Sequence, residues 1–160
     1  MDCWQKRVYK RKVENMEGFL GSFPELSYEN GKEPSPLALA YIGDAVYEVF
    51  VRKQLMGNPD LSVHKLHKEA TRYVKANSQA RIVLALEKDL TNEEWGIVKK
   101  GRNQKSKTMP KNSTVSDYRY ATGFEALLGH LFISERTERL MEIMNKAVEI
   151  IIEEECQNEE

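Results

Sequence analysis

The 160-residue sequence has few cysteines, no long apolar run and little net charge. Its two cysteines, Cys3 and Cys156, stand near opposite ends of the chain, which excludes a disulfide framework and a cysteine-based metal knuckle. No apolar run approaches the roughly 18 residues that a membrane span needs, and no leading segment resembles a signal peptide. We therefore expect a cytoplasmic protein without a membrane partner, of a length that suits one globular domain.

The formal net charge of −1 conceals an uneven distribution of charge. The stretch 99–111 holds basic residues and no acidic one, whereas the last eight residues are rich in glutamate. A second basic cluster lies at 6–12. The chain is therefore charge-segregated, which the whole-protein value hides. The basic residues of the central stretch are Lys99, Lys100, Arg102, Lys105, Lys107 and Lys111.

Strand-like alternation is also missing, and apolar residues recur at helical spacing instead. Ser35 followed by Pro36 is typical of a helix start, and the pattern continues to Gly57, a plausible helix stop. Ser62 opens a second predicted helix that ends near Lys88. The sequence therefore predicts an all-α fold.

Three further segments complete the predicted pattern. Thr91 and Glu94 form a capping box before a third helix. Residues 99–116 lack an apolar period and contain Gly, Pro, Asn and Ser, so we interpret them as a loop. A fourth helix is predicted from about Asp117 to Ile133, and Ser134 is predicted to cap a fifth.

The patterning predicts three parts in the chain. Residues 35–152 form the predicted domain, 1–34 an extension that packs on or precedes it, and 153–160 an acidic tail. Met16 is a second candidate for the start of the chain, and the sequence leaves open whether residues 1–15 belong to the domain.

Two predicted helices carry glycines beside an acidic residue. Gly43 precedes Asp44, while Gly123 and Gly129 flank Glu125. A mid-helix glycine costs roughly 0.5–1 kcal/mol relative to alanine, which suggests a close backbone approach that brings the two carboxylates together. The alternative is that both acids are ordinary surface charges, as one would read Glu48 one turn further on.

Two motifs carry a resemblance to a known family. The run YIGDAV at 41–46 resembles the signature helix of ribonuclease III, and TGFEALLG at 122–129 resembles the second acidic helix of that family. The resemblance covers about residues 35–152 and is closest to Mini-III, the short bacterial branch without a double-stranded-RNA-binding domain. It implies a helical endonuclease domain that forms a two-fold dimer.

The resemblance also implies an activity, namely Mg²⁺-dependent hydrolysis of double-stranded RNA that leaves 5′-phosphates, with Mn²⁺ as a substitute. Asp44 and Glu125 match two of the four family carboxylates. Ala40 and Thr122 stand where the family has a glutamate and an aspartate, and Leu37 replaces another acid. Because two carboxylates neutralise only one Mg²⁺, our hypothesis is that one ion binds the free protein. A second would arrive with RNA, through water and the Thr122 hydroxyl.

The implied partners are an RNA duplex, a second copy of the chain and a large-subunit ribosomal protein, with the 23S ribosomal RNA precursor as substrate. The six basic residues of 99–111 would track RNA phosphates. Leu37, Leu39, Tyr41 and Ile42 exceed what an internal core needs, which is consistent with a symmetric interface near Asp44. Two rival hypotheses remain: a non-catalytic RNA-binding or ribosome-associated protein of this fold, and a helical domain whose basic loop binds an acidic protein surface.

Overall fold

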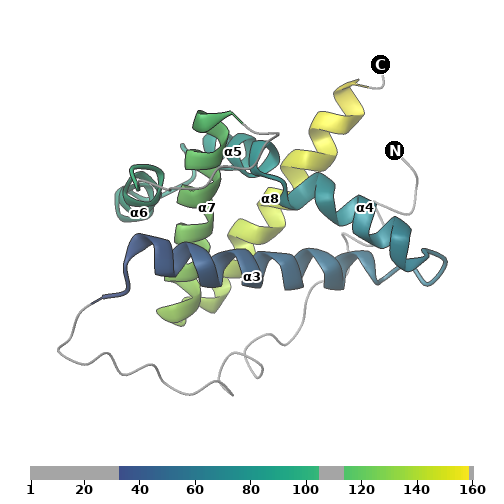
Figure 1. The fold of residues 1–160 in the computed structure, drawn as a ribbon, viewed down its shortest axis with the longest axis horizontal. Coiled ribbons are helices and arrows are strands. Elements are labelled where there is room, and N and C mark those ends of the chain that lie inside the picture. Colours follow the sequence, from purple (N-terminus) through teal and green to yellow (C-terminus); the bar gives the residue numbers. More distant parts are fainter. Residues whose placement is uncertain (1–32, 105–113, 159–160) are drawn as a thin grey trace.

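A computed structural model describes residues 33–104 and 114–158 of the chain, and within these ranges it contains six helices and no strand (Figure 1). The predicted all-α class is confirmed for this part. No helix in these two ranges is both long and apolar enough to cross a membrane. The helices are α3 (Pro36–Leu55), α4 (Val63–Val74), α5 (Ala76–Ala85), α6 (Asn92–Arg102), α7 (Val115–Ile133) and α8 (Thr137–Asn158).

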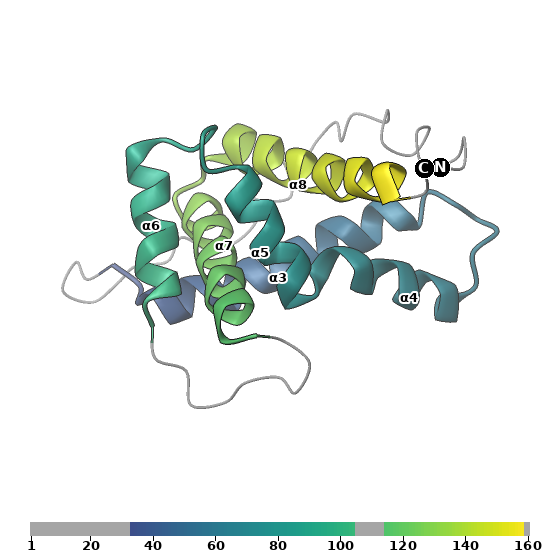
Figure 2. The ribbon, with the colours of Figure 1, turned by 90° about the horizontal axis from the view of Figure 1, so that it is seen from above.

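Helix α7 lies at the centre of the fold. It packs most extensively against α3, α5 and α6 and also contacts α8, so that other helices flank it on several sides (Figure 2). Its apolar side chains Phe124, Leu127, Leu128 and Leu131 are fully buried. Helix α3 packs against α7 and crosses it, as the horizontal and upright ribbons show (Figure 1). The buried packing of α7 therefore fixes the position of those α7 residues that lie next to α3.

Three predicted helix starts are confirmed. The Ser35 side chain accepts a hydrogen bond from the Ala38 amide at 3.2 Å, and Ser62 caps α4 in the same way. At α6, the Glu94 amide donates to Thr91 and the Glu94 carboxylate accepts from the Thr91 amide. These caps satisfy amide groups that have no partner inside the helix, which is why local sequence is enough to predict them.

The prediction of one continuous second helix is wrong, because the segment forms two helices, α4 and α5. The backbone is extended at Lys75, with φ −67° and ψ 149°, so that α4 ends at Val74 and α5 begins at Ala76. The break lets each half bury its own apolar side chains, such as Tyr73 on α4 and Ile82 on α5. Apolar spacing continues through the break, so periodicity alone could not locate it.

The predicted loop 99–116 is also partly wrong, because α6 continues through Arg102 and α7 begins at Val115. The last turn of α6 is held by burial of Val98 and Gly101 against α7, a contact that composition does not show.

Ser134 does not cap the fifth predicted helix. It ends α7, where its hydroxyl donates to the His130 carbonyl at 2.6 Å, and α8 begins at Thr137. Glu135 follows in the left-handed region at φ 55°, and hydrogen bonds from the Glu135 and Arg136 amides reach back to the last turn of α7. A serine can serve either end of a helix, so the sequence left its partner ambiguous. Helix α8 itself runs on to Asn158.

Candidate active site

Helices α3 and α7 meet backbone to backbone at two glycines. A Cβ atom on Gly43 would lie less than 3.0 Å from the Glu125 carbonyl oxygen and the Gly129 amide nitrogen, and one on Gly129 would collide with the Leu39 carbonyl. Only glycine allows this approach. The predicted close contact of the two helices is therefore present, with Asp44 directly after one glycine and Glu125 one turn before the other.

The crossing brings Asp44 and Glu125 into electrostatic contact. Asp44 is exposed on α3, whereas Glu125 is partly buried on α7. Burial and the neighbouring Asp44 carboxylate raise the pKa of Glu125 to about 8, and hydrogen bonding from the Gln79 side chain opposes this shift. Burial and Glu48 raise the pKa of Asp44. Each carboxyl group is therefore placed where its negative charge is unfavourable without a cation.

Glu48 lies one turn after Asp44 and adds to the negative potential there. One of its carboxylate oxygens is buried and lies 2.5 Å from the Arg52 guanidinium. Among the described residues, no three His, Cys, Asp or Glu side chains are close enough together to hold a metal ion. Glu48 is therefore an electrostatic neighbour paired with Arg52, while Asp44 and Glu125 remain the acidic pair at the crossing.

Gln79 on α5 joins this pair as a neutral side chain. It is 1% exposed, its Nε2 donates to the Val74 carbonyl at 2.9 Å, and it hydrogen-bonds with Glu125. Its Oε1 is buried and has no hydrogen-bond partner among the described residues. The two carboxylates lie in an unfavourable environment and offer oxygen ligands, which fit a hard divalent cation such as Mg²⁺.

Comparisons with known proteins show the family of the chain. The family model described as "Ribonuclease III domain" matches residues 37–136. The chain is 46% identical to a Mini-ribonuclease 3 from Clostridium tetani over 142 residues, which cover 88% of this chain and 92% of that protein. This chain belongs to the ribonuclease III family, in its Mini-ribonuclease 3 branch.

One further relative supports the family assignment, and one solved structure supports the fold. A Mini-ribonuclease 3 from Thermoanaerobacter is 46% identical over 139 residues, which cover 87% of this chain and 98% of that protein. A crystal structure of a Fusobacterium nucleatum protein superimposes with a TM-score of 0.68 at 30% identity and covers 80% of this chain and 99% of that one. The protein is accordingly an endoribonuclease with the ribonuclease III fold.

Two positions where ribonuclease III carries acids have packing roles in this chain. Ala40 is buried in a small apolar cluster with Leu39 and Ala126. Thr122 is 7% exposed, and its hydroxyl donates to the Tyr118 carbonyl at 3.0 Å. The Thr122 oxygen retains only its capacity to accept, which is the capacity that a water-mediated contact with a metal ion would use.

The third predicted glycine serves a different helix pair. A Cβ on Gly123 would lie 2.6 Å from the Val98 carbonyl of α6, and one on Gly101 would lie 2.9 Å from Thr122 O and Gly123 Cα. Gly123 therefore lets α6 approach α7 and does not lie at the α3 contact. Gly101 was missed because it stands in a polar stretch without apolar periodicity.

Three of the six predicted basic residues lie in the described part of the chain. Lys99 and Lys100 are exposed on the last turn of α6, whereas the Arg102 guanidinium donates to the Tyr120 hydroxyl at 3.2 Å and lies 5.4 Å from that ring's centroid. The other three, Lys105, Lys107 and Lys111, lie outside the described residues. Because Gly101 contacts Thr122, the end of α6 lies beside the turn of α7 that precedes Glu125.

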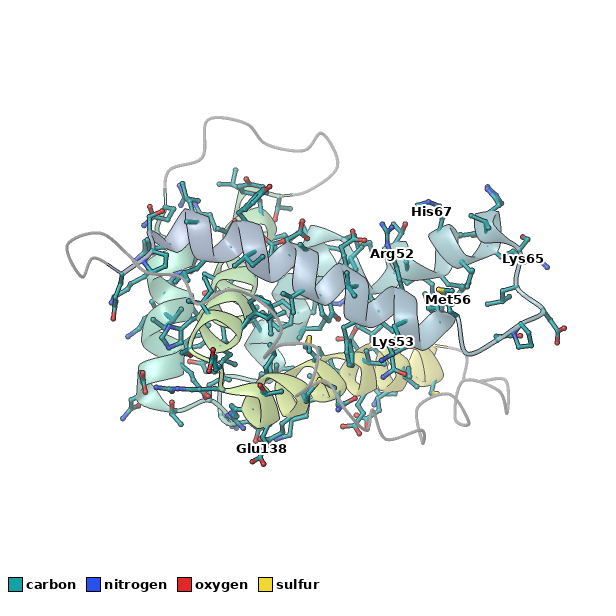
Figure 3. All side chains as sticks on the ribbon, turned by 90° about the horizontal axis from the view of Figure 1, so that it is seen from below. Arg52, Lys53, Met56, Lys65, His67 and Glu138 are labelled. Carbon is teal, nitrogen blue, oxygen red and sulfur yellow. The ribbon has the colours of Figure 1, made fainter. Side chains whose placement is uncertain are left out.

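A second group of basic side chains lies on α3 and α4. Arg52 and Lys53 end α3, and Lys65 and His67 belong to α4, at one end of the molecule (Figure 3). Gln79 was missed as a site residue. The sequence feature that could have indicated Gln79 is its position as a polar residue beside the apolar residues Ala80, Ile82 and Val83, all three of which are buried.

Proposed function

We propose that this endoribonuclease cuts double-stranded RNA and that Asp44 and Glu125 hold its catalytic Mg²⁺, for which Mn²⁺ can substitute. The observation that carries the proposal is the electrostatic cost that burial and the neighbouring Asp44 carboxylate impose on ionised Glu125 at the Gly43–Gly129 crossing. A divalent cation between them would remove that cost, because an opposite charge favours the ionised form of both groups.

The two acids would have different parts in the reaction. Asp44 is exposed and so stands on the side from which a phosphodiester can approach, while Glu125 is fixed from behind by α7 and Gln79. The Thr122 hydroxyl oxygen, one turn before Glu125, would accept a hydrogen bond from water. A bound Mg²⁺ would supply stabilisation of the charge that develops on the scissile phosphate, and the products would carry 5′-phosphates.

Binding of the duplex would rest on the basic residues of 99–111. A-form RNA is recognised mainly through phosphates and 2′-hydroxyls, because its major groove is deep and narrow. Lys99 and Lys100 are exposed beside the turn of α7 that leads to Glu125, which supports this placement. We assign Arg102, Lys105, Lys107 and Lys111 to the same phosphate-binding role.

We further propose that two copies act together. Leu37 and Tyr41 are 43% and 83% exposed on α3 near Asp44, which leaves apolar area for a symmetric interface. Leu39 is instead buried and Ile42 is partly buried beside Gly129, so these two side chains serve the internal packing. A dimer would place one acidic pair on each strand of the duplex.

The proposed substrate is the 23S ribosomal RNA precursor, bound together with a large-subunit ribosomal protein. Maturation of this precursor would place the protein in the cytoplasm.

One assay tests the activity and its residues. Purified protein is incubated with long double-stranded RNA and Mg²⁺, beside Asp44→Asn and Glu125→Gln. The matched control is Glu138→Gln, because Glu138 is an exposed acid at the start of α8, on the side of the molecule away from α4 (Figure 3). We expect cleavage by the parent and the control, and loss of at least 100-fold in both site variants, with RNA binding retained.

Two results would oppose the proposal. Cleavage at the parent rate by either site variant would remove the acids from the reaction. RNA binding without cleavage by the parent would favour the alternative of a non-catalytic RNA-binding protein of this fold. That alternative draws on Ala40 and Thr122, which replace two family acids.

A further inference from the structure

Gln79 is a fully buried amide in a helix that otherwise buries apolar or small side chains. Together with Ser78 it forms the buried polar part of α5, whose other buried residues are Ala80, Ile82 and Val83. Burying an amide costs roughly 1–3 kcal/mol in proteins unless its polar atoms find partners. The burial of the Gln79 amide therefore calls for a structural or a chemical explanation.

The Nε2 group of Gln79 is anchored at the break between α4 and α5. It donates at 2.9 Å to the carbonyl of Val74, the last residue of α4, which has no hydrogen-bond donor within its own helix. Because Lys75 is extended, this contact joins the end of α4 to the first turn of α5. The hydrogen bond to Val74 therefore fixes the position of the Gln79 side chain.

From that anchored position the amide reaches α7. The Gln79 side chain hydrogen-bonds with the Glu125 carboxylate, and α5 and α7 are extensively packed against one another. Asp44 approaches the same carboxylate from α3. The Glu125 carboxylate therefore has the neutral Gln79 amide and the like-charged Asp44 carboxylate as neighbours.

The Oε1 atom is the second polar atom of the Gln79 amide. It is buried and has no hydrogen-bond partner among the described residues. A buried unpartnered acceptor is uncommon and is often completed by water or by an ion. Mg²⁺ retains several of its waters in protein sites, and these waters are hydrogen-bond donors.

We infer that Gln79 is a positioning residue of the metal site: anchored on Val74, it holds the Glu125 carboxylate toward Asp44 and offers Oε1 to the hydration shell of the divalent cation. This inference rests on the proposed function, since it needs a cation at Asp44 and Glu125. It gives α5 a part in the site beside α3 and α7. Outer-shell partners of metal ligands change metal affinity or activity by about 10- to 100-fold when they are removed.

The test measures Mn²⁺ binding to the metal-free full-length protein by electron paramagnetic resonance, without RNA. Gln79→Met keeps the volume and removes both polar atoms. Ser78→Ala is the matched control, because it removes a polar atom from a buried residue of the same helix whose hydroxyl donates to Asn77. We expect Mn²⁺ affinity to fall at least tenfold for Gln79→Met and to stay within twofold of the parent for Ser78→Ala.

A purely structural role for Gln79 has a different signature. Gln79→Met would then melt at a lower temperature in a chelator while its folded form bound Mn²⁺ like the parent, and that result would overturn the inference. If Gln79→Met does not fold, Gln79→Asn takes its place, since the shorter amide cannot reach both Val74 and Glu125. We expect it also to lose at least tenfold in Mn²⁺ affinity, and parent-like affinity would overturn the inference in this case too.

Activity provides a second readout. Loss of metal positioning should lower kcat at limiting Mg²⁺, with recovery at high Mg²⁺ and an unchanged KM for RNA. Asp44→Asn distinguishes a missing metal site from a missing role of Gln79 in that site. If the parent binds Mn²⁺ and Asp44→Asn does not, the metal site stands and Gln79→Met alone decides this inference. If the parent does not bind Mn²⁺, the metal site and the inference fail together.

Discussion

Gly43 of α3 lies so close to α7 that a single methyl group on it would overlap the carbonyl oxygen of Glu125. The colliding atoms belong to the backbone of a buried helix, so they cannot move aside as the end of a flexible side chain could. The position of Glu125 relative to Asp44 therefore depends on the absence of a side chain at residue 43. Helix packing and the arrangement of the acids are two consequences of one contact.

We expect Gly43→Ala to destabilise the protein by about 3 kcal/mol or more and to abolish cleavage, because overpacking against backbone forces the helices apart. The measurement is urea unfolding alongside the RNA cleavage assay. Gly96→Ala is the control, since a Cβ at Gly96 would meet nothing within 4 Å. On helix propensity that control should gain about 0.5–1 kcal/mol. A Gly43→Ala protein with parental stability and activity would contradict the contact.

The metal-free protein should lose stability as the pH rises from about 4.5 to about 8. Because burial and Asp44 raise the pKa of Glu125 to about 8, the folded form holds a proton that the unfolded form has already released. The resulting stabilisation is complete below the ordinary carboxyl pKa and disappears as the pH passes the raised value. Thermal melting in a chelator across this range measures the effect.

Glu125→Gln provides the comparison for that pH series. The variant cannot ionise at residue 125, so its melting temperature should vary less with pH and exceed that of the metal-free parent at pH 8. Mg²⁺ should stabilise the parent most at high pH, where both carboxylates are ionised, and should leave Glu125→Gln almost unchanged. Parallel pH curves for the two proteins would show that Glu125 ionises normally.

Magnesium titration should reveal one tight ion per chain in the free protein. Asp44 and Glu125 supply two negative charges, which neutralise a single Mg²⁺, and the described residues offer no third acid close enough to bind it. A second ion should appear only when RNA phosphates are present. Calorimetric titration with and without duplex RNA measures both stoichiometries. Two tight sites in the free protein would refute this expectation.

Tyr47→Phe should raise the free energy of unfolding by up to about 1 kcal/mol. The Tyr47 ring is fully buried and packs edge-on against Phe124 at 5.3 Å, while its hydroxyl is buried with no hydrogen-bond partner among the described residues. Phenylalanine keeps the ring contact and removes the unsatisfied group. Tyr47→Leu should instead destabilise the protein. Denaturant unfolding distinguishes them, and a large loss for Tyr47→Phe would reveal an unrecognised partner.

Neutralising Lys105 and Lys107 should weaken binding of duplex RNA and flatten its dependence on salt, with less effect on the chemical step. Each lost phosphate contact lowers the slope of log affinity against log salt by about one. Lys146→Gln on α8 serves as the control, since Lys146 pairs with Glu142 at 3.3 Å. Binding measured at several salt concentrations tests this, and an unchanged slope would exclude the two lysines from the interface.

Local features of the chain were predictable because short-range forces decide them. The hydroxyl caps at Ser35, Ser62 and Thr91 act on amides three residues away, so their effect is contained in the local sequence. The glycines beside the two acids were recognisable for a related reason. A residue that weakens a helix needs a compensating contact, and Gly43 and Gly129 have it.

Other features depend on which segments meet in space. The break at Lys75 leaves the apolar spacing intact, and the last turn of α6 is held by contact with α7. Ser134 had the chemistry to cap either neighbouring helix, and packing assigned it to α7. Gly123 looked equivalent to Gly129 in sequence, yet it faces a different helix.

The sequence by itself determined the helical class, three helix starts and the pair of acids, because each follows from residue chemistry and spacing along one segment. Only the tertiary structure decided which helix each glycine meets, and that Gln79 from a third helix reaches the Glu125 carboxylate. Those relationships join residues far apart in the chain. Their energies depend on burial and charge in the assembled fold, which no local pattern encodes.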